Sequence, residues 1–339
     1  MELDPKRLAV VTGAGGFIGG HLVAELKRRG HEQIRAVDIK PLGRWYQEHE
    51  GVENVSADLR EKEPCYAVCK DAVFVFNLAA DMGGMGFIET HKADCMVSVL
   101  INTNMLIAAR DRGVEQFLFG SSACVYNGER QSDPKVTALK ESDAYPALPE
   151  DGYGWEKLFG ERMCRHFMED YGISVRVPRF HNVYGPHGTY DGGREKAPAA
   201  ICRKVIQAQL DDSGAIEIWG DGRQTRSFTF IDDALFGVLR LMEADISEPI
   251  NLGSAQLVTI NELVDIVEGI AGVKLERRYN LDAPQGVRGR NSDNTRIREL
   301  LGWEPSVSLE AGLEKTYAWI YEQMTSGARD EAALAFRGA

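Results

Sequence analysis

Cysteine is scarce in this sequence and follows no metal-binding or disulfide pattern. Six cysteines are scattered over 339 residues, with no Cys-x-x-Cys pair and no histidine cluster beside them. In a chain of this size, such cysteines are typical of free thiols in a reducing compartment, not of a disulfide framework or a zinc site. We therefore expect reduced cysteines, no bound metal and a cytoplasmic protein.

Long apolar runs and a surplus of positive charge are also missing. The most apolar windows, such as residues 72–76, are far too short to cross a bilayer. The first residues lead from Lys6 and Arg7 directly into a strand-like run, so we expect no signal peptide. Asp and Glu outnumber Lys and Arg by 51 to 39, and the formal net charge of -12 argues against a nucleic-acid or anionic-membrane partner.

Strand-like and helix-like stretches alternate through the first 180 residues. Short β-rich runs occupy residues 8–12, 34–37, 72–78, 117–119 and 175–177, and helix-like spacing occupies 18–29, 96–112 and 154–170. Repeated β-α-β units predict an α/β fold built on a doubly wound parallel sheet of the Rossmann type. After Gly/Pro-rich loops at 184–198, helices are expected at 233–242, 261–270 and 309–322, in a smaller C-terminal lobe over the carboxyl edge of the sheet.

A glycine-rich turn lies between the first strand and the first helix. Gly13, Gly16 and Gly19 let backbone amides approach a pyrophosphate at the positive end of the helix. Asp38 ends the second strand, where its carboxylate would accept hydrogen bonds from the adenosine ribose and repel a 2′-phosphate. This predicts NAD, not NADP, as the cofactor. The residues assigned to the cofactor are Gly13, Gly16, Phe17, Ile18, Gly19, Asp38, Asp58, Leu59, Ala79, Ala80, Tyr153 and Lys157.

The length of the chain and the order of its predicted elements indicate how it is divided into domains. A chain of 339 residues predicts roughly two domains. We expect the NAD-binding Rossmann domain over residues 1–180, with a segment near 227–253 returning to it. The substrate-binding lobe is expected over 181–325, followed by a C-terminal tail over 326–339.

A serine and a Tyr-x-x-x-Lys motif form the candidate redox centre. Ser122 follows the strand-like run 117–119, and Tyr153 and Lys157 are four residues apart, so on a helix they share one face. A protonated lysine near a tyrosine hydroxyl favours the phenolate and lowers the tyrosine pKa, which lets the tyrosine accept a proton from a sugar hydroxyl. The pattern predicts oxidation and reduction at an alcohol carbon, with Ser122 holding the same oxygen.

Around these motifs the chain resembles the extended short-chain dehydrogenase/reductase family of nucleotide-sugar enzymes, from Thr12 to about Trp319. The segments that carry the resemblance are the glycine turn, 77–80, Ser121–Ser122, the Tyr-x-x-x-Lys motif, 179–186, 226–233 and 301–305. Segments 80–87, 122–124, 192–200 and 287–294 are similar to the branch of that family that epimerises GDP-mannose at C3 and C5. The resemblance implies a GDP-sugar as the substrate and a tightly bound NAD that is recycled.

The same resemblance implies roles for a cysteine and a lysine. A ketone at C4 acidifies the C–H bonds at C3 and C5, and inversion needs a base on one face of the ring and an acid on the other. Cys124 and Lys196 match the acid/base pair of the family, and the sequence leaves open which of them takes the proton. The catalytic set is therefore Ser122, Cys124, Tyr153, Lys157 and Lys196. The expected substrate contacts are Gly83, Gly84, Met85, Ser122, Cys124, Asn182, Glu195, Lys196, Lys204, Arg226, Arg288 and Arg290, with Arg288 and Arg290 at the diphosphate.

Related activities stay open as alternatives. A nucleotide-sugar 4-epimerase has no use for Cys124 with Lys196, and a 4,6-dehydratase of this family carries Thr-Asp-Glu where this chain has Ser-Ala-Cys. A GDP-4-keto-6-deoxymannose epimerase/reductase consumes NADPH, which Asp38 disfavours. An epimerase that inverts only C3 or only C5 is a further alternative, and a NAD-sensing regulator without turnover is the non-enzyme one. By analogy with the family, helices 96–112 and 154–170 are expected to pack against their copies in a homodimer.

Overall fold

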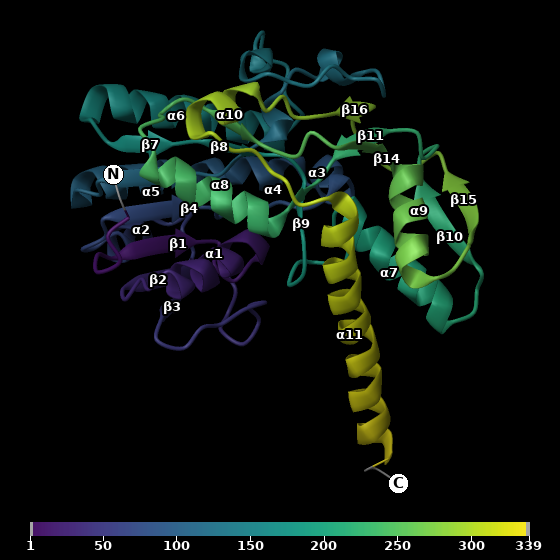
Figure 1. Ribbon diagram of the computed structural model, residues 1–339. Helices are drawn as coiled ribbons and strands as arrows, with labels where there is room; N and C mark the ends of the chain where they lie inside the picture. Colours follow the sequence, from purple (N-terminus) through teal and green to yellow (C-terminus); the bar gives the residue numbers. More distant parts are fainter. Residues whose placement is uncertain (1–2, 337–339) are drawn as a thin grey trace.

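The computed structural model describes residues 3–336, with side chains to residue 326, and is built on a six-stranded parallel sheet (Figure 1). The strand order is β3-β2-β1-β4-β5-β7. The strands are β1 Ala9–Thr12, β2 Ile34–Asp38, β3 Glu53–Ser56, β4 Phe74–Asn77, β5 Gln116–Phe119 and β7 Ser174–Arg176. The order reverses between β1 and β4, and in such sheets a ligand binds at the carboxyl ends of the strands at this point. The predicted doubly wound fold is confirmed.

Two layers of helices cover the sheet. The helices α1 Phe17–Arg28 and α8 Ile231–Glu243 lie on one face, and α2 Lys62–Val68, α5 Val99–Arg112 and α6 Tyr153–Tyr171 lie on the other. Successive residues of a strand point to opposite faces, so Val11 packs with the α1 side and Val10 with the α5 side, and both are fully buried. Burial on both faces is the reason that these strands read as continuous apolar runs.

The stretch 96–112, expected to be one helix, is broken at Ser98. The helices α4 Lys92–Val97 and α5 meet there, and α3 Met85–Thr90 precedes them. The buried Ser98 hydroxyl accepts a hydrogen bond from the backbone N–H of Asp81 at 2.9 Å. The single-helix prediction was wrong because apolar spacing carries no record of this contact with a distant loop.

A second lobe is built from two helices and two strands. The helices α7 Ala197–Leu210 and α9 Ile260–Ala271 pack together beside the parallel pair β10 Ala215–Trp219 and β15 Glu276–Asn280. The last helix, α11 Leu309–Phe336, contacts both α7 and α9 and then continues away from the body (Figure 1). We expected this helix to end at 322 and a tail to follow over 326–339. The helix instead continues to Phe336, and residues 337–339 lie outside the described part of the chain.

Short strands join the two lobes. One three-stranded sheet combines β6 Ser121–Ser122, β8 Pro178–Phe180 and β13 Ile250–Leu252, and another combines β11 Thr225–Ser227, β14 Leu257–Thr259 and β16 Gly289–Arg290. The remaining elements at this junction are β9 Val183–Tyr184 paired with β12 Thr229–Phe230, α10 Thr295–Leu301, and the 3-10 turns η1 Ala123–Val125, η2 Gly128–Gln131 and η3 Glu141–Ala144. Through α8 and β13, residues 231–252 lie against the first domain. The division of the chain at residue 180 stays a prediction.

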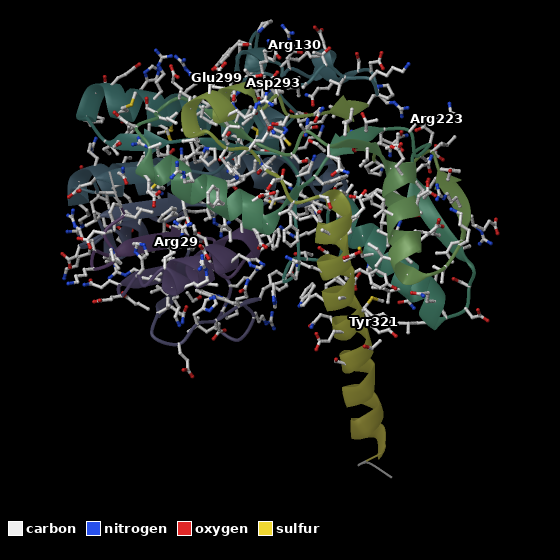
Figure 2. All side chains as sticks on the ribbon, in the orientation of Figure 1. Arg29, Arg130, Arg223, Asp293, Glu299 and Tyr321 are labelled. Carbon is white, nitrogen blue, oxygen red and sulfur yellow. The ribbon has the colours of Figure 1, made fainter. Side chains whose placement is uncertain are left out.

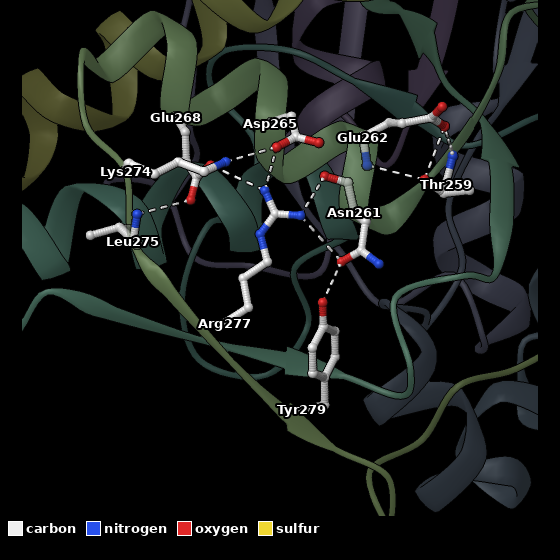
Figure 3. Close-up of polar contacts among 9 residues, drawn as sticks. All are labelled: Thr259, Asn261, Glu262, Asp265, Glu268, Lys274, Leu275, Arg277 and Tyr279. Atoms are coloured by element: carbon white, nitrogen blue, oxygen red, sulfur yellow. Dashed lines mark hydrogen bonds and ion pairs between the residues drawn. The ribbon is translucent and has the colours of Figure 1, made fainter.

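A polar cluster fastens β15 to α9 at the outer edge of the second lobe (Figure 3). Glu268 on α9 is almost fully buried, and it accepts hydrogen bonds from Lys274 Nζ at 2.6 Å and from the Leu275 N–H at 3.1 Å. Arg277 on β15 donates to Glu268 at 3.1 Å and also pairs with Asp265. The edge of the lobe is therefore held by charge-assisted hydrogen bonds, which are stronger than neutral ones.

Charged side chains cover the outside of the molecule (Figure 2). Arg29, Arg223 and Glu299 are exposed on three separate parts of this surface. Between residues 3 and 336, every helix is too short or too polar to cross a membrane.

Candidate active site

A cavity of about 750 Å³ opens at the carboxyl ends of β1, β2 and β4. Its size lies within the range of roughly 300–1,000 Å³ that is typical of small-molecule sites. Every cofactor residue predicted from the sequence lines it. The predicted residues in its wall are Gly13, Gly16, Phe17, Ile18, Gly19, Asp38, Asp58, Leu59, Ala79, Ala80, Gly83, Ser122, Tyr153, Lys157 and Lys196.

The turn after β1 is shaped for glycine. Gly13 has a φ of 69°, in the left-handed region that favours glycine. A Cβ atom on Gly19 would lie 2.2 Å from the Gly13 carbonyl oxygen, so α1 packs directly on the turn. The start of α1 has no side-chain cap, which leaves its first N–H groups and its positive dipole end for an anion. This cradle fits the pyrophosphate of NAD.

Asp38 lies at the end of the cavity where the adenosine of NAD is expected to bind. Its buried carboxylate accepts a hydrogen bond from the Lys40 N–H at 2.9 Å, and Arg60 lines the same region, paired with Asp58 at 2.6 Å. A carboxylate at the end of β2 suits a ribose with free hydroxyls. Lys40 and Arg60 were missed from the sequence, where their only signal is the position two residues after each predicted aspartate.

Ser122, Tyr153 and Lys157 come together inside the cavity. Tyr153 begins α6 and Lys157 lies one turn later, while Ser122 ends β6. The Ser122 hydroxyl accepts a hydrogen bond from the Cys124 N–H at 3.2 Å and lines the cavity together with Tyr153. The Lys157 amine lies 5.6 Å from the centre of the Tyr153 ring and 3.4 Å from Glu156 Oε2.

The pKa of the Tyr153 phenol is higher than the sequence predicted. Burial raises the pKa of Tyr153 well above its usual value, and the neighbouring Cys124 and Glu156 add to the rise. This pKa therefore lies above its usual value, not below it as expected, because burial dominates. The Lys157 amine also lies near the Phe119 ring, whose centre is 4.8 Å away. The chain by itself therefore holds a neutral phenol at this position.

The buried Cys124 and the half-buried Lys196 belong to one charged cluster. Cys124 lies in η1, and Lys196 immediately precedes α7. Arg290 on β16 donates from Nη1 to Cys124 Sγ at 3.5 Å and from Nη2 to Glu150 Oε1 at 2.8 Å. Its Nε donates to Gln131 Oε1 at 2.7 Å. The two acid/base candidates come from distant parts of the sequence, and the charges of Arg290 and Glu150 act on both of them.

Burial moves both candidates toward their neutral forms. It raises the pKa of Cys124 to about 11, with the Glu150 carboxylate adding to the rise and Arg290 opposing it. Burial also lowers the pKa of Lys196, against the opposing charges of Cys124 and Glu150 and with a further lowering from Arg290. A neutral thiol can donate a proton and a neutral amine can accept one.

Two loops close over the side of the cavity near Lys196. Arg194 Nη1 pairs with Asp81 Oδ1 at 2.6 Å, and its guanidinium lies 3.7 Å from the centre of the Phe87 ring. The Gly84 N–H donates to the Arg194 carbonyl at 2.9 Å, and a Cβ on Gly84 would lie only 2.2 Å from the Glu195 carbonyl oxygen. Glycine at position 84 is therefore required for the contact that fixes the segment before α7.

Several predicted substrate residues already have protein partners. Arg288 forms two hydrogen bonds with Asp221, at 3.1 and 3.0 Å, and Arg290 donates hydrogen bonds to Cys124 and Glu150. The predicted substrate residues outside the cavity wall are Gly84, Met85, Cys124, Asn182, Glu195, Lys204, Arg226, Arg288 and Arg290. Their contacts with substrate stay predictions.

Sequence reasoning missed Glu150 and Gln131, which hold Arg290. Gln131 is fully buried, and the Glu150 side chain is 12% exposed. Neither residue belongs to a recognisable motif. The only signal for Glu150 is its position three residues before Tyr153.

The chain is similar to known sugar-nucleotide enzymes over most of its length. The sequence profile of the NAD dependent epimerase/dehydratase family matches residues 9–253. GDP-mannose 3,5-epimerase 1 of Oryza sativa subsp. indica is 50% identical over 315 residues, which cover 93% of this chain and 82% of that protein. Among solved structures, UDP-glucose 4-epimerase of Thermotoga maritima is 26% identical with a TM-score of 0.83, covering 93% of this chain and 99% of that one. UDP-glucuronic acid 4-epimerase of Bacillus cereus, in complex with UDP-glucuronic acid and NAD, is 25% identical with a TM-score of 0.80 and the same coverage of 93% and 99%.

Proposed function

Since the chain belongs to the NAD-dependent epimerase/dehydratase family, we propose that it epimerises GDP-mannose at C3 and C5 through a transient ketone at C4, giving GDP-L-galactose and GDP-L-gulose. The 50% identity to the rice GDP-mannose 3,5-epimerase supports this substrate. The observation that carries the proposal is the cluster of the buried Cys124 and the half-buried Lys196 near Ser122 and Tyr153. A 4-epimerase also needs the serine and the tyrosine, but its reaction requires neither the thiol nor the amine.

The glycine cradle and Asp38 would hold the cofactor, and Tyr153 and Ser122 would hold C4 of the sugar. NAD, when bound there, supplies reversible hydride chemistry at C4. Tyr153 must first lose its own proton; as the phenolate it then takes the proton of the C4 hydroxyl and becomes the phenol, which later returns that proton, while Ser122 keeps the same oxygen in place. The Lys157 ammonium, 5.6 Å from the tyrosine ring, stabilises the phenolate that exists before the C4 proton is taken and again after it is returned.

Cys124 and Lys196 would exchange protons at the carbons next to the ketone. In mannose, the hydrogens on C3 and C5 lie on the same face of the ring. One base can therefore remove both of them in turn, and one acid on the opposite face can deliver both replacements. The pair must be reset between the two inversions, because each inversion leaves the base protonated and the acid deprotonated.

We also propose that the protein is a homodimer and that it is cytoplasmic. Exposed apolar side chains on α4, α5 and α6 support self-association through these helices, namely Met96, Val97, Leu100, Trp155 and Phe159. All six cysteines are buried free thiols, which is typical of a reducing compartment. Light scattering of the purified protein tests the dimer, and fractionation of the producing cell tests the location.

Incubation with GDP-mannose in D₂O tests the reaction. Without added cofactor, we expect deuterium at C3 and C5 in the NMR spectrum, together with GDP-L-galactose and GDP-L-gulose. Deuterium at a single carbon would restrict the enzyme to one inversion. A protein that contains NAD but catalyses no exchange on GDP-mannose would contradict the proposed substrate or reaction.

A further inference from the structure

Two loops meet at the rim of the NAD cavity through a hydrogen bond between two side chains. The Tyr46 hydroxyl lies 2.7 Å from the Thr189 hydroxyl, and both residues line the cavity. Tyr46 comes from the loop between β2 and β3, and Thr189 comes from the segment that leads from β9 to α7. The contact is exposed to solvent, so it lies at the edge of the cavity. A loop of the first domain and a segment that leads into the second lobe are therefore joined at the cofactor site.

The Tyr46 side of this bridge is fixed on the glycine turn. The Trp45 indole is buried and lies on Gly15, since a Cβ atom on Gly15 would be only 2.7 Å from the ring. The indole Nε1 donates to the Lys40 carbonyl at 3.0 Å, and the Lys40 ammonium donates to the Gly15 carbonyl at 3.1 Å. The same ammonium lies 4.9 Å from the centre of the Tyr46 ring. The backbone that carries Tyr46 is thus held at the turn assigned to pyrophosphate.

The Thr189 side has anchors of its own. A Cβ atom on Gly188 would be 3.3 Å from the ring of Phe17, the first residue of α1. On the other side of Thr189, the Tyr190 ring packs edge-on against Trp319 of α11, with the ring centres 5.6 Å apart. Thr189 is therefore held between a contact with α1 and a contact with α11.

The bridge is weak in comparison with the anchors on either side of it. Trp45 lies on Gly15 and Gly188 lies on Phe17, so the two hydroxyls close the cavity wall beside the turn that is shaped for pyrophosphate. A solvent-exposed hydrogen bond between two neutral hydroxyls contributes little net free energy. It can therefore break while both anchors stay in place. This part of the wall can open without the unfolding of either loop.

We propose that Tyr46 and Thr189 retain the cofactor: their hydrogen bond closes the cavity wall across the pyrophosphate part of NAD and must break before NAD can leave. Slow release suits the proposed reaction, in which the hydride returns to the sugar and no NADH is set free. The retention itself concerns the cofactor alone, so it stands or fails independently of the sugar on which the enzyme acts.

The rate at which the cofactor leaves tests this proposal. Protein stripped of its cofactor is loaded with NADH, which is fluorescent, and is then mixed rapidly with a large excess of NAD. The change in fluorescence as NADH leaves gives the release rate. Tyr46→Phe removes one hydroxyl and keeps the ring, and Thr189→Val removes the other hydroxyl at nearly constant volume. For each variant we expect release about two- to tenfold faster than from the unaltered protein, which is the range for one lost hydrogen bond.

The double variant distinguishes one shared bond from two independent contacts. If the two hydroxyls act through each other, Tyr46→Phe combined with Thr189→Val should release NADH no faster than the faster single variant. Tyr279→Phe is the matched control, because it removes another exposed tyrosine hydroxyl, bonded to Asn261 at 3.0 Å outside the cavity wall (Figure 3). Its release rate should equal that of the unaltered protein.

Two results would overturn the proposal. The first is a release rate that is the same in Tyr46→Phe, in Thr189→Val and in the unaltered protein. The second is a double variant in which the effects of the two substitutions multiply, because each hydroxyl would then act through a contact of its own. Faster release in both single variants, without a further increase in the double variant, would support the proposed closure.

Discussion

Glu161 on α6 accepts two hydrogen bonds from the guanidinium of Arg179 on β8, at 2.8 and 2.7 Å. It accepts a third from the Ser121 hydroxyl at 2.5 Å. The two charged side chains are only 4% and 3% exposed. Helix α6 carries Tyr153 and strand β6 carries Ser122, so this buried ion pair holds the two parts of the C4 site in a fixed relation.

Replacement of Glu161 should therefore destabilise the protein strongly. Glu161→Ala leaves the Arg179 charge buried without its partner, and breaking such a pair costs about 3–5 kcal/mol. The free energy of unfolding from denaturant titration measures this loss. Glu169→Ala, on the exposed part of the same helix, should change it little. Equal effects of the two substitutions would show that the buried pair contributes no more to the free energy of unfolding than the exposed residue does.

The close approach of α1 to the glycine turn predicts a loss of cofactor in Gly19→Ala. The new methyl group would meet the Gly13 carbonyl at 2.2 Å, and overpacking of this kind costs about 1–3 kcal/mol. We expect NAD to bind at least about tenfold more weakly, measured by calorimetry on protein stripped of its cofactor. Gly269→Ala on α9 meets no atom within 4 Å and should raise the stability by about 0.5–1 kcal/mol with NAD affinity unchanged.

The phenol of Tyr153 is predicted to be indispensable for oxidation at C4. Tyr153→Phe removes the proton acceptor while keeping the ring, and the loss of a general acid/base group lowers kcat by roughly 10²–10⁴-fold. The measurement is the rate of epimer formation from GDP-mannose, with the NAD content of the purified variant checked in parallel. Tyr171→Phe, at the exposed end of α6, serves as the control and should keep the full rate. Full activity of Tyr153→Phe would assign the C4 proton to another group.

The cluster at the edge of the second lobe predicts a stability that depends on pH (Figure 3). Burial opposes ionisation of Glu268, but hydrogen bonds from Lys274, the Leu275 N–H and Arg277 lower its pKa below the ordinary value of 4.5. A carboxyl whose pKa is lowered on folding contributes stability above its unfolded pKa and loses it as the pH falls through the folded value. The free energy of unfolding should therefore fall less steeply below pH 4.5 in Glu268→Gln than in the unaltered protein.

An exposed carboxylate on the same lobe provides the control for that measurement. Glu276 on β15 pairs with Arg278 at 3.3 Å, and the two side chains are largely exposed. Glu276→Gln should leave the slope of stability against pH nearly unchanged. If both substitutions flatten the curve equally, the buried cluster is not the source of the acid sensitivity.

The parts of the fold that could be predicted are those encoded by neighbouring residues. The apolar run at 72–78 and the glycines after β1 depend on local spacing, so the parallel sheet and the NAD cradle follow from the sequence alone. The break at Ser98 depends on a hydrogen bond from Asp81, 17 positions away. Contacts of this kind leave no periodic signal, which is why one long helix was expected there.

The site was only partly predictable for the same reason. Cys124 and Lys196 were recognised by resemblance, but the pKa of each is shifted mainly by burial, with smaller effects of Glu150 and Arg290, which come from other segments of the chain. Arginine residues in a Gly-Arg-rich segment are commonly read as phosphate ligands, and Arg290 was read in that way. Its burial against Gln131, 159 positions earlier in the sequence, became visible only in three dimensions.

Arg290 follows Cys124 by 166 positions, and this separation has a consequence for biosynthesis. Proteins are made from the N-terminus, and early parts begin to fold while later parts are still being translated. The cradle after β1 and the helix with Tyr153 leave the ribosome before β16 has been made. A nascent chain can thus assemble its nucleotide-holding half while the thiol still lacks its guanidinium neighbour. The thiol site is therefore completed later than the nucleotide-binding half, once β16 has been made.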